Sequence, residues 1–239
     1  MTESPSTRQS KDLNQKRLDA ALQSKGASGD SIHNAVLDSV SKLYQNNSDL
    51  SLLDMGCGSG KLLQSMGKRF SGLKLFGADL VDYNENEKNY EFLGLDFNDE
   101  EALKEVIANN QFDVVTSVEV IEHLENPRQY MRLLSSFLKP GGTLIVTTPN
   151  PESYTSILSF FMRGYHSAFG PKDYPAHITV VSSYEMNNMV SEIDGINVQG
   201  TYFIPNGRIP KLSFKWHSLF PFLRGKRFSD NYLALIQKS

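Results

Sequence analysis

A glycine-rich segment at residues 52–62, LLDMGCGSGKL, constrains the fold of this chain more than any other feature. The apolar run at residues 52–55 predicts a short strand, and the apolar spacing over residues 61–70 predicts a helix. Three glycines occupy the turn between them: Gly56, Gly58 and Gly60. Glycine carries no Cβ, so a ligand can approach the backbone of this turn closely. The sequence therefore predicts a strand, a ligand-binding turn and a helix in immediate succession.

Two phosphate-binding motifs fit this segment poorly. A dinucleotide fingerprint requires Gly or Ala three residues after its second glycine, and Lys61 occupies that position. A P-loop requires a glycine five residues before its last glycine and Ser or Thr after its lysine, but Met55 and Leu62 stand there. The spacing therefore disfavours a nicotinamide oxidoreductase and a nucleotide triphosphatase.

The rest of the chain alternates between apolar strands and amphipathic helices. Strands are predicted at residues 52–55, 73–80, 90–97, 112–118, 143–148, 197–204 and 232–237, and helices at 32–44, 61–70, 99–109, 128–138 and 183–193. This alternation predicts a doubly wound, mostly parallel α/β sheet, Rossmann-like, with helices on both faces. Ligands bind such sheets outside the carboxyl ends of the strands. Residues 1–27 are polar and predict a mobile tail, so residues 28–239 are expected to form a single domain.

Two loops that leave the carboxyl ends of strands are long, at residues 149–181 and 205–231. Loops of this length are uncommon unless they have a function. The first contains six aromatic residues between Tyr154 and Tyr174. We therefore expect two lid-like insertions above the same edge of the sheet.

Composition excludes several classes of protein. The net charge of −3 does not indicate a nucleic-acid-binding protein. Cys57 is the one cysteine, which excludes an internal disulfide and a cysteine-only metal cluster, and we interpret it as a small side chain packed beside the ligand of the glycine turn. The N-terminal segment has no apolar run, and no stretch reaches the apolar length of a membrane span. A cytoplasmic protein is expected.

Acidic residues end the second and third predicted strands. A carboxylate at Asp79 can accept hydrogen bonds from both hydroxyls of a ribose. Asp96 can accept a hydrogen bond from an adenine amino group, while Phe97 packs against the ring. Beside a glycine turn, these residues together predict a nucleoside pocket.

Five segments in order resemble the motifs of the class I S-adenosylmethionine (SAM)-dependent methyltransferases: LLDMGCGSGKL, GADL, GLDF, FDVVTSVEVIEHLENP and LKPGGTLIVTTPN. Within that class, the chain resembles the methyltransferase type 11 and type 12 families. The resemblance is close over residues 52–150 and implies a seven-stranded sheet whose last strand is antiparallel. It also implies the residues that hold SAM: Gly56, Gly58 and Gly60 at the methionine end, Asp79 at the ribose, Asp96 with Phe97 at the adenine, and Asp54, Leu80 and Glu119 as further contacts. The chain departs from the family at residues 81–89, which are too short and polar for the usual second helix, so a truncated helix or a loop is expected.

Methyl transfer is an in-line displacement that depends on positioning, and a hydroxyl acceptor benefits from a general base or a cation. Glu119, Glu122 and His123 stand at i, i+3 and i+4, so they share one face if the chain turns helical there. Together with His177 they are candidate ligands of a divalent cation. This pattern is similar to metal-assisted methyltransferases of the ubiquinone pathway and of small-RNA 3′ ends. In the alternative interpretation Glu119 closes over SAM, Glu122 caps a helix and His123 packs.

His177 is also a candidate general base, because the pKa of an unperturbed histidine lies near the working range. The candidate catalytic residues are therefore His177, Glu119 and His123. The alternative for His177 is a histidine at a helix entry that is hydrogen-bonded to backbone. His166 lies among aromatic residues and is expected to pack.

Residues 208–227 contain six basic residues and no acidic ones, interleaved with aromatic residues. Such a segment can bind nucleic acid, an anionic lipid surface or a phosphorylated substrate. We expect the aromatic residues to pack on residues 154–169. The charges suggest an anionic acceptor or a lipid-linked sugar, and thus peripheral membrane contact, and the segment resembles saccharide-modifying O-methyltransferases.

The leading hypothesis is a SAM-dependent enzyme that methylates an oxygen of a small-molecule acceptor, such as a saccharide or another anionic metabolite. A metal-dependent RNA 2′-O-methyltransferase is an alternative, disfavoured by the net charge and by the absence of an added RNA-binding module, so no nucleic-acid partner is expected. A SAM-binding protein without turnover is the alternative from another class.

Overall fold

The computed structural model describes residues 28–44, 49–83, 88–95, 103, 105–107, 110–209, 212 and 214–239. Within these residues, seven strands form one sheet in the order β3-β2-β1-β4-β5-β7-β6. The strands are β1 (Ser51–Met55), β2 (Lys74–Asp79), β3 (Glu91–Gly94), β4 (Phe112–Val118), β5 (Leu138–Pro149), β6 (Ile196–Ile204) and β7 (Asn231–Lys238).

Strand directions confirm the predicted topology. The pairs β1–β2, β1–β4, β2–β3 and β4–β5 are parallel. The last strand, β7, lies between β5 and β6 and is antiparallel to both. Strands β1 to β6 therefore run in the same direction, and their carboxyl ends meet at one edge of the sheet, where the predicted site residues lie.

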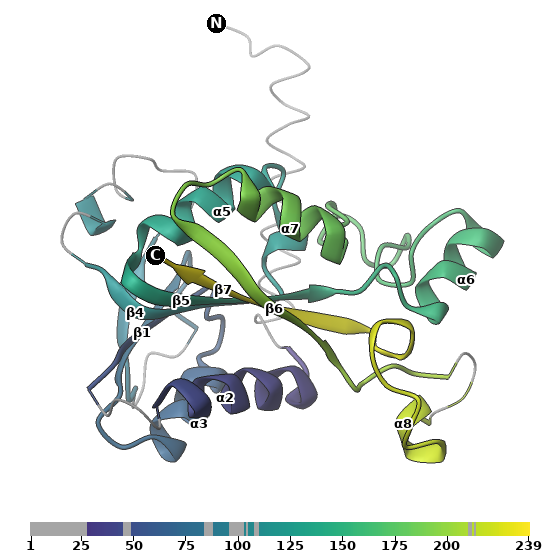
Figure 1. Ribbon diagram of the computed structural model, residues 1–239, viewed down its shortest axis with the longest axis horizontal. Helices are drawn as coiled ribbons and strands as arrows, with labels where there is room; N and C mark the ends of the chain where they lie inside the picture. Colours follow the sequence, from purple (N-terminus) through teal and green to yellow (C-terminus); the bar gives the residue numbers. More distant parts are fainter. Residues whose placement is uncertain are drawn as a thin grey trace, which may run out of the picture.

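Helices cover both faces of the sheet (Figure 1). The elements outside the sheet are α2 (Asp30–Tyr44), α3 (Lys61–Arg69), η1 (Ile121–His123), α5 (Pro127–Ser136), α6 (Tyr154–Arg163), α7 (Ser183–Ser191), α8 (Trp216–Leu219) and η2 (Lys226–Phe228). One apolar core contains Met131 of α5 and Met186 of α7, and the other contains Val36 of α2 and Met66 of α3. Burial of these apolar residues against the sheet accounts for the predicted helical spacing.

The prediction for residues 128–138 was wrong at its carboxyl end. The helix ends at Ser136, and Leu138 already belongs to β5, where it pairs with Phe112. The Phe112 amide donates to the carbonyl of Phe137 at 2.8 Å, so sheet pairing ends the helix before Pro140 is reached. The pairing of β4 with β5 shifts in register between Phe112, which pairs with Leu138, and Val114, which pairs with Thr143. This shift accommodates residues 139–142 of β5.

Some predictions fall on residues outside the described part of the chain. These are the tail at residues 1–27, the adenine contacts Asp96 and Phe97, and most of the helix at 99–109, of which residues 103 and 105–107 are helical. Residues 81–83 and 88–90, the described flanks of the departure from the family pattern, contain no helix. In the described part of the chain, no helix is both long and apolar enough to cross a membrane.

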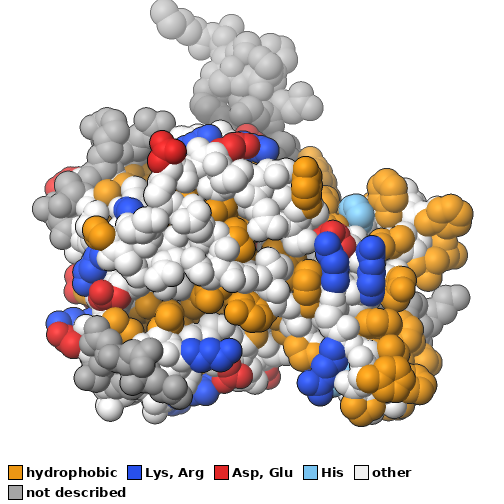
Figure 2. Space-filling model, in the orientation of Figure 1, with side chains coloured by type: hydrophobic (Ala, Val, Ile, Leu, Met, Phe, Trp, Pro, Cys, Tyr) orange, Lys and Arg blue, Asp and Glu red, His pale blue; other side chains and the backbone are white. Residues whose placement is uncertain are grey.

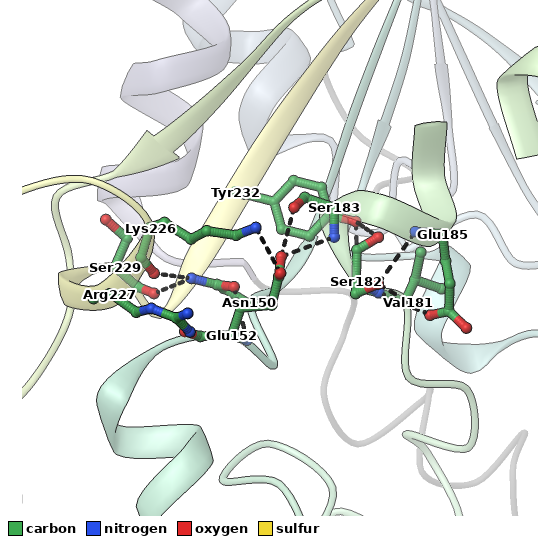
Figure 3. A network of polar contacts seen from close by, with 10 residues as sticks. All are labelled: Asn150, Glu152, Val181, Ser182, Ser183, Glu185, Lys226, Arg227, Ser229 and Tyr232. Atoms are coloured by element: carbon green, nitrogen blue, oxygen red, sulfur yellow. Dashed lines mark hydrogen bonds and ion pairs between the residues drawn. The ribbon is translucent and has the colours of Figure 1, made fainter. Parts of the chain in front are cut away.

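The two long segments after β5 and β6 contain the short helices α6 and α8, which had been expected only as loops. A polar network joins the bases of these segments (Figure 3). Buried Asn150 donates from its side-chain nitrogen to the carbonyls of Lys226 at 2.7 Å and Ser229 at 2.8 Å. The Glu152 carboxylate accepts from the Lys226 ammonium at 2.6 Å and from the hydroxyl of Ser183, the first residue of α7. Both segments are therefore fixed to the sheet and to each other at their bases.

Candidate functional site

The glycine turn follows β1 and is bonded directly to β2. The amides of Gly56 and Cys57 donate to the carbonyl of Ala78 at 2.8 and 3.1 Å. The three glycines, Gly56, Gly58 and Gly60, all have positive φ, a backbone region that favours glycine. Cys57 is buried, and burial raises the pKa of its thiol, which agrees with a packed side chain and not with a nucleophile.

Asp79 lies at the end of β2 and faces this turn. One carboxylate oxygen accepts the Gly58 amide at 2.8 Å, and the other accepts the Leu80 amide at 2.7 Å. Burial raises the pKa of Asp79, while the backbone hydrogen bonds from Gly58, Leu80 and Val81 oppose the rise. Each oxygen retains a lone pair that a ligand hydroxyl can use. Leu80, beside it, is half exposed.

Asp54 borders a cavity under the glycine turn. The cavity is lined by Ser28, His33, Asp54, Gly56, Cys57, Lys61, Leu62 and Val118. Asp54 is buried and accepts a hydrogen bond from the Thr116 hydroxyl at 2.6 Å. Burial raises the pKa of this carboxyl to about 7. Ser28 and His33 were missed by sequence reasoning, because only the packing of α2 on the sheet brings them here.

Glu119 directly follows β4 in a strained backbone conformation with φ +57°. Its carboxylate accepts the Thr147 hydroxyl at 3.1 Å and the Asn231 side-chain amide at 2.7 Å. Burial raises the pKa of Glu119 to about 7, against the effect of these two hydrogen bonds. A side chain held in this way at a strained position is typical of a functional site.

Glu122 is fully buried in η1. One carboxylate oxygen accepts the Thr148 hydroxyl at 3.0 Å, and the other, Oε1, is buried without a hydrogen-bond partner in the described structure. Burial and the neighbouring Glu119 carboxylate raise the pKa of Glu122 well above its ordinary value. The Glu122 carbonyl accepts the amides of Ile178 and Thr179, which brings the end of the first long segment against η1.

Two histidines meet beside Glu122. The ring centroids of His123 and His177 are 4.8 Å apart. His123 Nδ1 bonds to the carbonyl of Ala176 at 2.9 Å, and His177 Nδ1 bonds to the carbonyl of Ala168 at 2.7 Å. Desolvation and the neighbouring His177 lower the pKa of His123, while the Ala176 and Glu119 carbonyls act in the opposite direction.

One possible metal-ligand atom from each of Glu122, His123 and His177 lies within 4.8 Å of the others. Glu119 is not in this group, and its oxygens contact Thr147 and Asn231 instead. The common helical face considered for the acidic residues does not form, because η1 begins only at Ile121.

A family model described as a methyltransferase domain matches residues 30–194. This chain belongs to the class I SAM-dependent methyltransferases. It is 27% identical over 179 residues to the ubiquinone biosynthesis O-methyltransferase of Rickettsia bellii, and the alignment covers 68% of this chain and 71% of the relative.

Solved structures share the fold at low sequence identity. A SAM-dependent methyltransferase from Archaeoglobus fulgidus matches with a TM-score of 0.53 and 18% identity, covering 87% of this chain and 94% of that one. The magnesium protoporphyrin IX methyltransferase of Synechocystis PCC 6803, solved with bound S-adenosylhomocysteine (SAH), matches with a TM-score of 0.56 and 15% identity. That match covers 92% of this chain and 94% of the other.

In this methyltransferase, the described residues of the predicted SAM site lie around one edge of the sheet: Asp54, Gly56, Gly58, Gly60, Asp79, Leu80 and Glu119. Their contacts with SAM stay predictions. The partners of Glu119 and of the buried Glu122 were not predicted; they are Thr147, Thr148 and Asn231. His166 stacks on Phe160 with a centroid distance of 4.9 Å, which confirms the expected packing.

Replacing Gly56 by alanine is expected to destabilise the methyltransferase more than replacing Gly141 does. The two glycines have nearly equal φ, +77° and +76°, so alanine suffers a similar strain of roughly 1–2 kcal/mol at each. A Cβ on Gly56 would lie 2.5 Å from Cγ2 of Val120, whereas a Cβ on Gly141 would meet nothing within 4 Å. The overlap adds about 1–3 kcal/mol. Urea unfolding of both variants measures the difference, and equal losses would contradict the close packing of the turn.

Replacing Asp54 by asparagine is expected to stabilise the unliganded enzyme, and more at pH 8 than at pH 5. Burial raises the pKa of Asp54 from 3.8 to about 7, so the unfolded chain releases this proton at lower pH than the folded chain. The resulting cost to folding grows from about pH 4 to about pH 7 and is constant above that. It amounts to roughly 4 kcal/mol, since a tenfold change in proton affinity is worth about 1.4 kcal/mol.

Asp113, at the amino-terminal end of β4, provides a control in which the same substitution should have the opposite effect on stability. Burial raises the pKa of Asp113, but hydrogen bonds from Lys139 and Ser51 outweigh that effect and the net pKa is lowered. Asp113→Asn is therefore expected to destabilise the fold at pH 8. Urea unfolding at both pH values tests the pair, and an Asp54→Asn variant less stable than the parent at pH 8 contradicts the prediction.

Proposed function

We propose that this methyltransferase transfers the methyl group of SAM to an oxygen of a small-molecule acceptor, with a divalent cation held by Glu122, His123 and His177. The observation that carries the proposal is the convergence of these three side chains beyond the carboxyl end of β4, where Glu122 and His123 follow the cavity-lining Val118 by four and five positions. The naming of the Rickettsia bellii relative as an O-methyltransferase supports an oxygen acceptor.

The residues present fit a cation. Glu122 Oε1 is a buried oxygen without a hydrogen-bond partner in the described structure, which is costly unless a ligand completes it. The Nδ1 hydrogen bonds of His123 and His177 to backbone carbonyls favour the tautomer whose Nε2 carries the lone pair. Imidazole nitrogens with one carboxylate suit Zn²⁺ or a similar transition-metal ion.

Donor binding is assigned to the glycine turn and the two acidic residues beside it. Asp79 accepts the ribose hydroxyls with the lone pairs that remain on its two oxygens. Asp54 faces the cavity and is suited to the ammonium of the methionine end, whose charge favours the ionised carboxylate. Gly56, Gly58 and Gly60 leave room for the donor along the turn.

Transfer then requires the acceptor oxygen to lie opposite the sulfonium, which is chiefly a matter of positioning. A bound divalent cation supplies Lewis acidity that lowers the pKa of an acceptor hydroxyl. Glu122, His123 and His177 orient that hydroxyl. Glu119 is held by its hydrogen bonds from Thr147 and Asn231 and acts as a positioning residue. Where a cation is absent, the Nε2 lone pair of His177 is the group suited to accept the hydroxyl proton.

The proposal is tested with purified enzyme, methyl-labelled SAM and a panel of catechol, saccharide and sugar-phosphate acceptors. We expect labelled product with at least one hydroxyl acceptor, loss of transfer on treatment with a chelator, and recovery on addition of Zn²⁺ or Mn²⁺. SAH affinity, measured by calorimetry, should survive chelation because the donor contacts are separate. Undiminished transfer after chelation contradicts the proposed role of the cation, and transfer only to nitrogen acceptors contradicts O-methylation.

A further inference from the structure

Helix α6 exposes the side of itself that a helix in water normally buries. Ser156 and Ser159 face the protein and are buried. The large apolar side chains face outward, and Phe161 is 87% and Met162 69% exposed. The other exposed apolar residues of this helix are Tyr154, Ile157, Leu158 and Phe160. Such an inverted arrangement indicates that something outside the described chain covers this face.

The second long segment has the same character. Phe222 is 79% exposed, and its other exposed apolar residues are Leu212, Phe214, Leu219 and Phe220. The ring contact made with residues 154–169 comes from outside the basic segment: Phe228 contacts Tyr154 at 5.3 Å, and Trp216 contacts Phe228 at 5.7 Å between ring centroids. The expected packing of the aromatic residues of 208–227 on residues 154–169 stays a prediction. The tips of both segments remain uncovered.

Both segments project from the same end of the molecule (Figure 1). Thr155 Oγ1 donates to the carbonyl of Arg208 at 3.0 Å, and Arg227 donates to the carbonyl of Glu152 at 2.8 Å. We call the exposed apolar residues of α6 and of residues 212–222 the apolar tips. With the network around Asn150, these bonds fix the two apolar tips relative to each other.

Basic side chains lie on the same two segments as the apolar tips. Exposed Arg and Lys residues on the two segments are Arg163, Lys172, Arg208, Arg224 and Arg227. The sequence from residue 208 to residue 227 holds six basic and no acidic residues, although the whole chain has a net charge of −3. Figure 2 shows hydrophobic side chains gathered over this end, with Lys and Arg side chains between them.

The combination of apolar and basic side chains discriminates between a second copy of the chain and a lipid bilayer as the partner of this surface. A second copy of the chain on the same face would bring like charges together. An anionic bilayer satisfies both features, because its headgroups attract the basic residues while aromatic and aliphatic tips enter the boundary with the acyl chains. We propose that the apolar tips and the basic residues on the same two segments form a docking surface for an anionic lipid bilayer.

Docking there explains how an amphiphilic acceptor would reach the site, an extension that rests on the proposed function. The segment that follows α6 leads directly to His177, whose ring contacts Phe169 at a centroid distance of 5.6 Å. His177 is also bonded to Ala168, so the docking helix and one of the proposed cation ligands belong to one continuous segment. The acceptor class that fits is a membrane-resident molecule with a hydroxyl-bearing headgroup.

The test is co-sedimentation of the full chain with vesicles of phosphatidylcholine alone or with about one-third phosphatidylglycerol. We expect binding to the anionic vesicles, at least tenfold weaker binding to the neutral ones, and weakening with added salt. The double substitution Phe161→Ser with Phe222→Ser should reduce binding to anionic vesicles at least tenfold. Tyr184→Ser, which removes an exposed aromatic on α7, should leave it unchanged and is the matched control.

SAH affinity of each variant, measured without vesicles, separates this inference from the proposed function and reports an intact fold. Absence of vesicle binding by the parent chain overturns the docking surface. So does equal binding by the double variant, or a dimer in sedimentation equilibrium that the double variant dissociates. Vesicle binding needs neither donor nor acceptor, so it stands or fails independently of methyl transfer.

Discussion

Replacing Asp79 by alanine is expected to weaken SAM and SAH binding by about 10²- to 10⁴-fold. Hydrogen bonds that involve a charged group contribute roughly 1.5–3 kcal/mol each, and the carboxylate is placed to accept two from a ribose. Each 1.4 kcal/mol corresponds to about a factor of ten in affinity. The substitution also leaves the Gly58 amide without its present partner, so the turn itself loses a restraint.

Calorimetric titration with SAH measures this loss, and two further variants interpret it. Asp79→Asn keeps one acceptor oxygen and should lose only about tenfold. Asp113→Asn changes a carboxylate at the opposite end of the sheet and should bind SAH like the parent chain. An Asp79→Ala variant that is folded and binds SAH normally would place the donor elsewhere and remove the basis of the nucleoside pocket.

Local features of the fold were predictable because they depend on residues close in sequence. The apolar run of β1, the glycine turn and the helical spacing of α3 lie within residues 51–69, and each follows from backbone or side-chain properties of those residues alone. The position of Asp79 beside the turn followed from the parallel sheet, since carboxyl ends of neighbouring strands meet at one edge.

Features that depend on distant pairing were not predictable in the same way. Leu138 looked like the end of a helix because its pairing with Phe112 is not visible in the local pattern. Asn231 reaches Glu119 across 112 positions, and nothing in its surroundings marks it as a site residue. The metal-ligand pattern was predicted from spacing, but the contacts of Glu119 with Thr147 and Asn231 separate it from the two histidines.

The segment after β5 shows why composition alone was ambiguous. Its aromatic residues predicted a lid, and the basic stretch after β6 allowed either packing or contact with an anionic partner. Only the structure shows that the serines of α6 are buried while Phe161 is exposed. An amphipathic pattern defines two faces of a helix, but the tertiary structure decides which face meets the protein.

Replacing Glu122 by glutamine is expected to lower turnover at least 100-fold and to abolish binding of Zn²⁺ or Mn²⁺, with SAH affinity unchanged. The amide has nearly the same shape and can still accept the Thr148 hydroxyl, but it lacks the charge that a divalent cation requires. Metal titration by calorimetry and a steady-state assay measure the two effects. Glu185→Gln, at the exposed start of α7, is the matched control and should alter neither.

Stability of the Glu122→Gln variant separates chemistry from misfolding. Burial and the Glu119 carboxylate raise the pKa of Glu122, so this side chain is costly to hold as a carboxylate in the unliganded fold. A neutral amide avoids that cost, and the unliganded variant should unfold at the same or a higher urea concentration than the parent. A residue that weakens the apo fold and yet carries turnover is typical of a site kept for function. Loss of turnover together with loss of stability would instead assign Glu122 to the structural framework of η1.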